Sequence, residues 1–311
     1  MKMSHWVPRF LFVGIVTALA GCSNTSQTTP PVPLQNGGLA ESNSLPVTAG
    51  STALSNLRVH PSSGSNLYVT NFYGNTVTVY APNTKLVLRT ISQGLDEPAG
   101  LALDGSGNLY ASNLGGSTVT VYAPGSTSVL RTISQGISTP ISLGFSKAGN
   151  LYVLNDGNNT VTVYKPGSAK VQRTISQGIS GPFALAFDTS GNVYIANLNN
   201  STVTAYAPGS SQVLETISQG VSGPNDVILD DSDNLYVSNQ HNDTITVYAP
   251  GSTSVLRTIS QGVSDPVQLA FDGSGNLYVA DYGANKVTVY GPGSGRVHAR
   301  VYFRRELVLR G

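Results

Sequence analysis

A sequence repeat of 42 residues constrains this chain more than any other feature. A strand start of the form Asn-Leu-Tyr or Asn-Val-Tyr recurs six times without insertion or deletion, with its asparagine at Asn66, Asn108, Asn150, Asn192, Asn234 and Asn276. Two other segments recur with the same spacing. Copies of Thr-Val-Thr-Val-Tyr and its variants begin at Thr76 and end with the copy that begins at Lys286, and copies of Thr-Ile-Ser-Gln-Gly begin at Thr90 and end with the copy that begins at Thr258. A fixed period in this range indicates a repeat architecture, in which each copy is one supersecondary unit.

Each copy is expected to form four short β-strands. In the second copy, residues 98–103 read as an apolar strand, and residues 104–108 supply Asp, Gly, Ser and Asn for a turn. In residues 109–112, large apolar and aromatic side chains alternate with a period of two, as expected for a strand. Residues 118–123 are rich in β-branched side chains, which favour strands. Residues 129–133 are more polar, and we expect them to form the outermost strand.

Six such units predict an all-β fold, a six-bladed β-propeller of four antiparallel strands per blade over residues 54–302. No segment shows an uninterrupted helical period, which excludes helical solenoids. We expect every blade to come from contiguous sequence, with blade one opening near Arg58–Val59 and blade six closing with residues 297–302. The chain ends then meet at a seam between blades one and six, with no strand exchanged across it.

The segment from Asp272 to Val287 resembles an NHL-type repeat, and the whole span 54–302 is similar to the six-bladed NHL and gluconolactonase-like propellers. This resemblance implies a fold more than a function, because the architecture serves enzymes and binding platforms alike. In the other five copies the aspartate at Asp281 is an asparagine, namely Asn71, Asn113, Asn155, Asn197 and Asn239. We expect these asparagines to close turns or, alternatively, to line a polar channel mouth.

Residues 1–21 read as a lipoprotein signal peptide. Lys2 and Arg9 flank an apolar run over 10–20 that is short for a permanent membrane span. The run ends at Leu19-Ala20-Gly21-Cys22, which resembles a bacterial lipobox, and the resemblance implies cleavage before Cys22 and acylation of that residue. The alternative is an ordinary secretory signal with a chance cysteine. Because the residue after Cys22 is not aspartate, the resemblance favours the outer membrane, in the periplasm or at the cell surface.

The segments that flank the repeats lack the apolar patterning of a folded unit. Residues 22–53 are rich in Ser, Thr, Pro and Gly and are expected to be a flexible tether between the lipid anchor and the propeller. Residues 303–311 form a basic tail with no counterpart in the repeats. The loss of the repeat sequence after Gly295 also suggests that the end of the chain is a frame-shifted copy.

Composition excludes several classes of protein. Removing Lys2 and Arg9 with the leader from the 17 basic residues leaves 15, against 16 acidic ones, and five arginines lie in the last 16 residues. The repeats are therefore mildly acidic, which argues against nucleic-acid binding. Cys22 is the single cysteine, so the chain has neither an internal disulfide framework nor a cysteine-based metal site. We expect a monomer.

The sequence contains few residues or motifs that are typical of catalytic sites. Beyond the leader there are three histidines, His60, His241 and His298, and no recognised hydrolase, metalloprotease, P-loop or dinucleotide motif. The acidic run over 230–233 could hold calcium, but it lacks the full spacing of an EF-hand loop, and a solvated turn is the alternative. We expect no cofactor, although calcium or another divalent metal stays open.

Variation among the copies gathers in two loops, one before and just after the proline that opens each blade and one between the second and third strands. In propeller geometry both loops open on the same face, and side chains that differ from blade to blade there suggest a binding surface. The alternative is that exposed loops simply drift. The candidate ligand-binding residues are Phe72, Tyr73, Glu97, Phe183, Asn225, Asp226, His241 and Tyr282.

These observations favour a membrane-anchored, non-enzymatic platform of the cell envelope that binds a protein, peptide or glycan. The alternative is a gluconolactonase-like, metal-dependent hydrolase with its metal at the centre of the channel. Its candidate ligands are Glu97, Asn225, Asp226 and Asp281, and none matches that family's motifs closely enough to be assigned a role. A third interpretation is a structural spacer with no small ligand.

Overall fold

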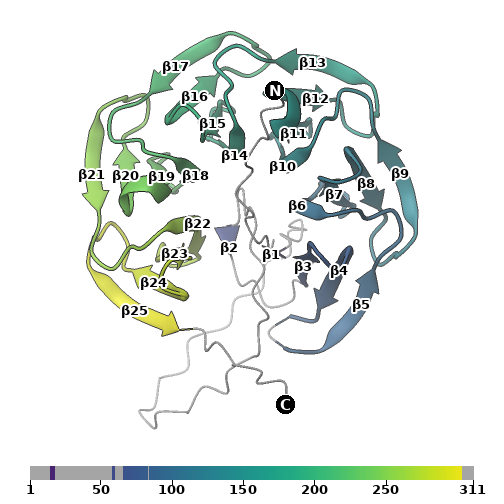
Figure 1. Cartoon of the computed structure of the whole chain (residues 1–311), viewed down its shortest axis with the longest axis horizontal. Helices are drawn as coiled ribbons and strands as arrows, with labels where there is room; N and C mark the ends of the chain where they lie inside the picture. Colours follow the sequence, from purple (N-terminus) through teal and green to yellow (C-terminus); the bar gives the residue numbers. More distant parts are fainter. Residues whose placement is uncertain (1–14, 18–57, 60–65, 83, 303–311) are drawn as a thin grey trace, which may run out of the picture.

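The computed structural model describes residues 15–17, 58–59, 66–82 and 84–302. Six sheets stand around a central axis, and the chain passes from one sheet to the next around the ring (Figure 1). The fold is therefore the predicted all-β, six-bladed propeller. Cys22, the tether over 22–53 and the tail over 303–311 lie outside the described residues.

Blades two to five each consist of four consecutive antiparallel strands, with the first strand nearest the axis and the fourth at the rim. Blade two contains β6 (Pro98–Leu103), β7 (Leu109–Asn113), β8 (Thr118–Tyr122) and β9 (Val129–Ile133). Blade three contains β10 (Pro140–Phe145), β11 (Leu151–Asn155), β12 (Thr160–Tyr164) and β13 (Val171–Ile175). Each strand begins one period after its counterpart.

The next two blades repeat this layout. Blade four contains β14 (Pro182–Phe187), β15 (Val193–Asn197), β16 (Thr202–Tyr206) and β17 (Val213–Ile217). Blade five contains β18 (Pro224–Leu229), β19 (Leu235–Asn239), β20 (Thr244–Tyr248) and β21 (Val255–Ile259). Within these blades, the loops after β11 and β19 contain single 3-10 turns, Asp156–Asn158 and Gln240–Asn242.

Blades six and one meet at the seam. Blade six contains β22 (Pro266–Asp272), β23 (Leu277–Asp281), β24 (Lys286–Tyr290) and β25 (Val297–Tyr302). Blade one contains β3 (Leu67–Asn71), β4 (Thr76–Tyr80) and β5 (Val87–Ile91). The prediction that residues 297–302 close blade six is confirmed.

The predicted opening of blade one is wrong. Arg58–Val59 forms β2, which pairs in parallel with β22 and so joins blade six. The inner position of blade one is taken instead by β1 (Ile15–Thr17), which pairs antiparallel with β3. A short β-branched segment that lies far outside the repeats therefore takes this strand edge, and a comparison of the repeats with one another leaves such a segment out.

The hydrophobic core lies between the blades. Each apolar cluster draws on two neighbouring blades; the cluster between blades one and two, for example, joins Val77, Val79 and Ile91 to Leu101 and Tyr122. Five tyrosines at the end of the third strand are fully buried in these layers, namely Tyr122, Tyr164, Tyr206, Tyr248 and Tyr290. No blade buries its apolar faces alone, so the ring folds as one unit.

Each buried tyrosine also ties its blade to the preceding one. The Tyr206 hydroxyl donates to the carbonyl oxygen of Gln177 at 2.6 Å, and the same bond recurs at every boundary from blade two to blade six. The next residue, Gly178, has a φ of +75°, and a Cβ there would lie 2.9 Å from Val213 Cγ2 in the following blade. This close approach explains why Ser-Gln-Gly repeats so strictly.

A second tie lies at the rim. Arg131 lies over the Tyr110 ring, with its guanidinium carbon 5.8 Å from the ring centroid, and donates to the Tyr110 hydroxyl and to the carbonyl of Gly167 in the next blade. Arg89, Arg173 and Arg257 stack in the same way on Tyr68, Tyr152 and Tyr236. Blade four differs, because Glu215 holds this position beside Tyr194. Burial, followed by the Asp188 charge, raises the pKa of the Glu215 carboxyl.

The variant Glu215→Arg should therefore stabilise the propeller. An arginine there can stack on Tyr194 and reach the Gly251 carbonyl, and it replaces repulsion from Asp188 by attraction. We expect a gain of about 0.5–1 kcal/mol, which thermal unfolding would record as a rise in Tm of roughly 1–4 °C for a domain of this size. The reciprocal variant Arg173→Glu should lower Tm by a similar amount. If Glu215→Arg leaves Tm unchanged or lowers it, the stacked arginine is not a stabilising tie.

Candidate functional site

The two variable loops of each blade meet on one face of the ring, as the sequence predicts. Within blade four, the backbone N–H groups of Leu198 and Asn199 donate to the carbonyls of Gly181 and Ser180. Between blades, the Gly181 N–H donates to Asn159 Oδ1 of blade three at 2.6 Å. Equivalent bonds cross the other boundaries from blade one to blade six. We call the surface that these loops form the variable face.

A buried asparagine clamp supports this face in blades two to five. Asn113 Oδ1 accepts the Asp96 N–H at 3.2 Å, and Asn113 Nδ2 donates to the hydroxyls of Thr118 and Thr120. The equivalent residues Asn155, Asn197 and Asn239 make the same contacts and are also fully buried. In these blades the asparagine series therefore holds the loops in place from inside the blade, and its amides do not reach a channel mouth.

The predicted site residues fall into an accessible group and a buried group. Tyr73 is 65% exposed and Tyr282 is 47% exposed, and His241 is also exposed. Glu97 and Phe183 are half-buried. Phe72, Asn225 and Asp226 are buried, at 9%, 5% and 1% exposure.

The accessible group lies on consecutive blades. Tyr73 belongs to the loop after β3 in blade one, Tyr282 to the loop after β23 in blade six, and His241 to the loop after β19 in blade five. Glu97 is next to this series, because its N–H donates to Asn75 Oδ1 at 2.7 Å. We call Tyr73, Glu97, His241 and Tyr282 together the aromatic arc, after the three rings among them. These residues lie on both sides of the seam between blades six and one.

Neighbouring residues hold two members of the arc in place. The Tyr73 ring meets the buried Phe72 ring edge to face, with centroids 5.2 Å apart and planes at 86°. The His241 imidazole lies against Gly223, where a Cβ would come within 2.5 Å of its ring. The loop geometry therefore presents these rings in defined positions on the surface.

The buried Asp226 side chain links blades five and six through hydrogen bonds. Its Oδ1 accepts the Val227 N–H and its Oδ2 accepts the Leu269 N–H of β22, each at 2.9 Å. The Asp226 N–H donates to Ser238 Oγ at 2.8 Å. Burial raises the pKa of the Asp226 carboxyl well above its usual value, although the two backbone donors act to lower it.

Two more of the candidate metal ligands, Asn225 and Asp281, also have protein partners. Asn225 Nδ2 donates to Gln240 Oε1 at 2.6 Å. Asp281 accepts the Ser264 N–H and the Thr288 hydroxyl, and its Oδ2 lies 3.7 Å from Lys286 Nζ. Among the described residues, no group of three or more His, Cys, Asp or Glu side chains is placed to hold a metal ion.

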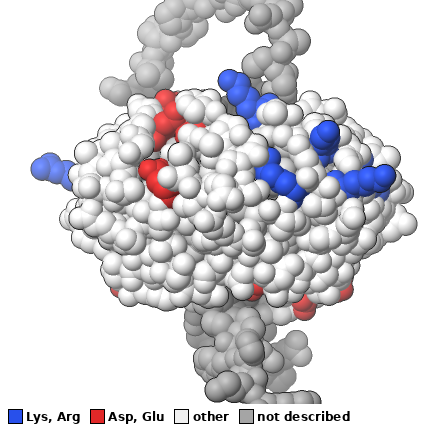
Figure 2. Space-filling view, turned by 90° about the horizontal axis from the view of Figure 1, so that it is seen from above, with Lys and Arg blue, Asp and Glu red and all other residues white. Residues whose placement is uncertain are grey.

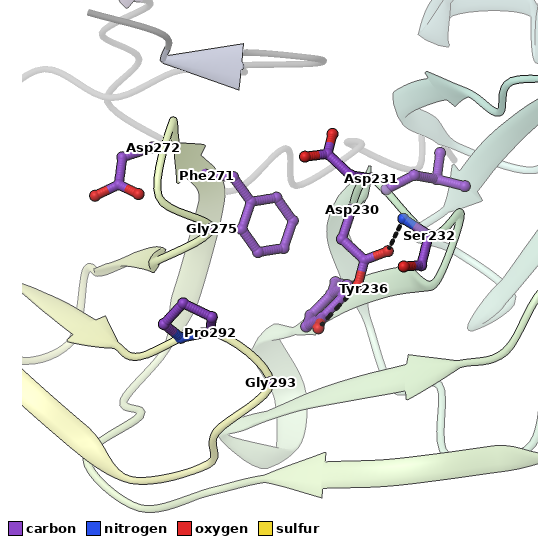
Figure 3. A pocket seen from close by; sticks show the side chains of 10 residues that line it. Asp230, Asp231, Ser232, Tyr236, Phe271, Asp272, Gly275, Pro292 and Gly293 are labelled. Atoms are coloured by element: carbon purple, nitrogen blue, oxygen red, sulfur yellow. Dashed lines mark hydrogen bonds between the residues drawn. The ribbon is translucent and has the colours of Figure 1, made fainter. Parts of the chain in front are cut away.

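The acidic run over 230–233 forms a turn at the end of the blades opposite the variable face. Asp230 Oδ1 accepts the N–H groups of Ser232 and Asn234, and Asp233 accepts the N–H and hydroxyl of Thr189 from blade four. A cavity of about 180 Å³ lies beside it between blades five and six, with Tyr236, Phe271 and Pro292 among its walls (Figure 3). The acidic run stands out in the sequence, but this cavity does not, because a gap between two blades depends on how the blades pack.

Charged side chains are few on the side of the ring shown in Figure 2, which agrees with a charged content of 11%. Within the described residues, no helix has the length and hydropathy needed to cross a membrane.

Solved structures share this fold. Virginiamycin B lyase from Staphylococcus aureus aligns with a TM-score of 0.65 at 11% identity, covering 79% of this chain and 83% of the lyase. A catalytically inactive form of that lyase with quinupristin gives 0.66 at 12% identity, covering 78% and 82%. Hydrazine synthase from Kuenenia stuttgartiensis gives 0.66 at 17% identity, covering 78% and 84%. Likeness at this identity shows the β-propeller fold alone.

No protein-family model and no curated protein matches the chain.

The buried Asp226 should make folding stability depend on pH. Because its folded-state pKa is raised, the folded protein binds a proton that the unfolded chain does not, over the interval between that raised pKa and about 3.9. Its contribution to the free energy of unfolding should therefore increase as the pH falls through this interval. Urea unfolding at several pH values should show that Asp226→Asn loses this contribution.

Ser238→Ala is the matched control, because it removes the hydroxyl that accepts the Asp226 N–H without removing a titratable group. It should destabilise the protein and keep the pH dependence of the parent chain. An Asp226→Asn variant with the parent's pH dependence would show that the carboxyl is not the titrating group.

Proposed function

We propose that this protein is a membrane-anchored propeller of the bacterial cell envelope that binds a protein, peptide or glycan on its variable face without catalysing a reaction. The observation that carries this proposal is the aromatic arc. Among the described residues the exposed tyrosine side chains are Tyr73, Tyr278 and Tyr282, and two of these three lie on the variable face of adjacent blades. An exposed tyrosine offers a flat apolar face and a polar hydroxyl, which suits sugar rings and peptide side chains.

Polar groups beside the rings can orient such a ligand. Glu97 offers a half-buried carboxylate next to the Tyr73 loop, and His241 offers an imidazole on the adjoining blade of the arc. Ligand sites commonly combine apolar surface with a few placed polar groups of this kind. Phe183 packs against the core cluster that contains Ile141 and Leu185, on blade four, and so contributes less to the arc than the sequence suggests.

No specific observation favours the hydrolase alternative. Asn225, Asp226 and Asp281, three of its four candidate ligands, are buried with protein partners. The lyase and synthase activities named for the structural neighbours belong to those proteins.

The aromatic arc predicts where substitutions weaken binding. Once screening of peptide and glycan libraries has identified a ligand, Tyr73→Ala and Tyr282→Ala should each lower its affinity about five- to tenfold or more, equivalent to at least about 1 kcal/mol, in calorimetric titrations. Tyr278→Ala is the matched control, because this exposed tyrosine donates to Asp272 at the opposite end of blade six. Equal losses for all three variants would place the site elsewhere.

The lipobox supports the proposed anchor. Acylation with more than one chain gives stable membrane attachment, whereas a single chain is marginal. Cys22→Ala should therefore move the protein from the membrane fraction to the soluble fraction, or leave it membrane-bound through an uncleaved leader, and immunoblotting with mass analysis of the N-terminus separates the two. A mature wild-type chain that begins anywhere other than Cys22 contradicts the anchor.

A further inference from the structure

The loops of the variable face carry negative charge without positive charge. They follow the second and fourth strands of the blades, and in the part of the chain that the structure describes they contain neither lysine nor arginine. Their acidic residues are Asp96, Glu97, Asp156, Asp243 and Asp265. The loops at the opposite end are mixed, since they hold lysines such as Lys147 and Lys165 as well as aspartates. The variable face therefore has the charge of a surface for a cationic partner.

One lysine begins a strand beside these loops, but it already has partners. Lys286 is the first residue of β24, and only 10% of its side chain is exposed. Its Nζ donates to the Gly262 carbonyl at 2.6 Å and lies 3.7 Å from Asp281 Oδ2. Between described residues, no ion pair reaches Glu97 or Asp265. The charge of these two carboxylates is therefore uncompensated within this part of the chain.

Each exposed tyrosine of the arc has an acidic residue bonded to its own loop. The Glu97 N–H donates at 2.7 Å to the Oδ1 of Asn75, in the loop that carries Tyr73. On the other side of the seam, the backbone carbonyl of Asp265 accepts the Tyr282 N–H at 3.1 Å. An aromatic ring and a carboxylate therefore lie close together in sequence and space on both sides of the seam.

The propeller itself does not require these side chains. Gly181 and Gly223 stand at the position of Glu97 and Asp265, and all four residues have a left-handed backbone with φ between +49° and +58°. Glycine adopts this conformation at less cost than a residue with a side chain. Blades two and three also have glycine at the position of Tyr73. The two carboxylates and this tyrosine are therefore available for a ligand.

The rim of the blades shows which group such a combination binds. The Tyr110 hydroxyl donates to Asp104 Oδ2 at 3.4 Å, and the Arg131 guanidinium carbon lies 5.8 Å from the centroid of the Tyr110 ring. Blade five repeats this arrangement. Arginine suits it because a planar guanidinium stacks on an aromatic ring and donates hydrogen bonds to acceptors beside the ring. The arc has the ring and the carboxylate, and its loops supply no arginine.

We propose that the aromatic arc binds a basic, arginine-containing peptide segment of a partner protein, whose guanidinium groups lie on the Tyr73 and Tyr282 rings and bind the carboxylates beside them. The inference rests on the proposed function and narrows its ligand to one class. A neutral glycan can stack on the rings but gains nothing from the negative charge, and an anionic one is repelled. Exposed ion pairs and cation–π contacts are each weak, so recognition requires several arginines in the segment.

Two labelled peptides test the ligand class on the purified full-length protein. One peptide repeats Gly-Arg-Ser, and the other carries citrulline, a neutral residue of nearly the same shape, in place of each arginine. Fluorescence anisotropy at low ionic strength should show that the arginine peptide binds at least about tenfold more tightly, because only this peptide carries charge that the carboxylates attract. Added salt should weaken its binding and leave that of the citrulline peptide nearly unchanged.

Substitutions locate the contact. Tyr73→Ala and Tyr282→Ala should weaken binding of the arginine peptide by the factor predicted above for a ligand of the arc. Glu97→Gln and Asp265→Asn should each weaken it about two- to fivefold. Glu215→Gln is the matched control, because it removes one negative charge at the rim of blade four and should leave the affinity nearly unchanged. If Glu97→Gln folds poorly, Glu97→Gly replaces it, since glycine holds this position in blades four and five.

The outcomes separate this inference from the proposed function. Equal affinities for the two peptides, or no binding of the arginine peptide, overturn the cationic ligand. A glycan or neutral peptide whose affinity falls in Tyr73→Ala would then still support a binding surface on the arc. An arginine peptide that binds the four substituted proteins as tightly as the parent overturns the placement of its site. Equal losses for Glu215→Gln and Glu97→Gln indicate long-range attraction in place of contact, which also overturns the proposal.

Discussion

The packing of one blade on the next is the constraint on which the whole structure depends. A single blade has two apolar faces and no means of burying them, so the fully buried tyrosines of one blade complete the core of its neighbour. The bond from the Tyr206 hydroxyl to the Gln177 carbonyl adds direction to this packing, since a buried hydroxyl without a partner is costly. The strict sequence period follows, because every boundary must reproduce the same contacts. It also explains why the seam, where the period ends on both sides, is the place at which the chain departs from the regular pattern.

The strand order within the blades and the number of blades could be read from the sequence, because both follow from a period that the sequence displays six times. Predicted strands such as 98–103 and 129–133 match β6 and β9. The partner of β3 could not be predicted, since Ile15–Thr17 lies outside the repeats and reaches β3 from far away in the sequence, while Arg58–Val59 pairs with β22. Tertiary pairing of this kind leaves no trace in a comparison of repeats with one another.

The candidate site was predictable only in part. Loop variability correctly brought Tyr73, His241 and Tyr282 to one face, because antiparallel blades place both loop sets at the same end. It did not separate surface from interior at Asn225 and Asp226, which belong to the inner strand β18 and are buried at the boundary with blade six. A polar residue in an otherwise apolar strand has two explanations, a ligand contact or a buried bond. Asp226 shows the second, since backbone N–H groups from two blades bind its carboxylate.

The way in which the variable face is held explains why it can vary at all. The clamp at Asn113 binds the backbone N–H of residue 96, and the bond from Asn159 reaches the backbone N–H of residue 181. Backbone donors are present whatever side chain follows, so the loops can change residue type at little cost to the ring. Variation alone is therefore weak support for a binding surface. Exposed aromatic rings are stronger support, because solvent exposure of Tyr73 and Tyr282 leaves apolar area in water that neither the clamps nor the core requires.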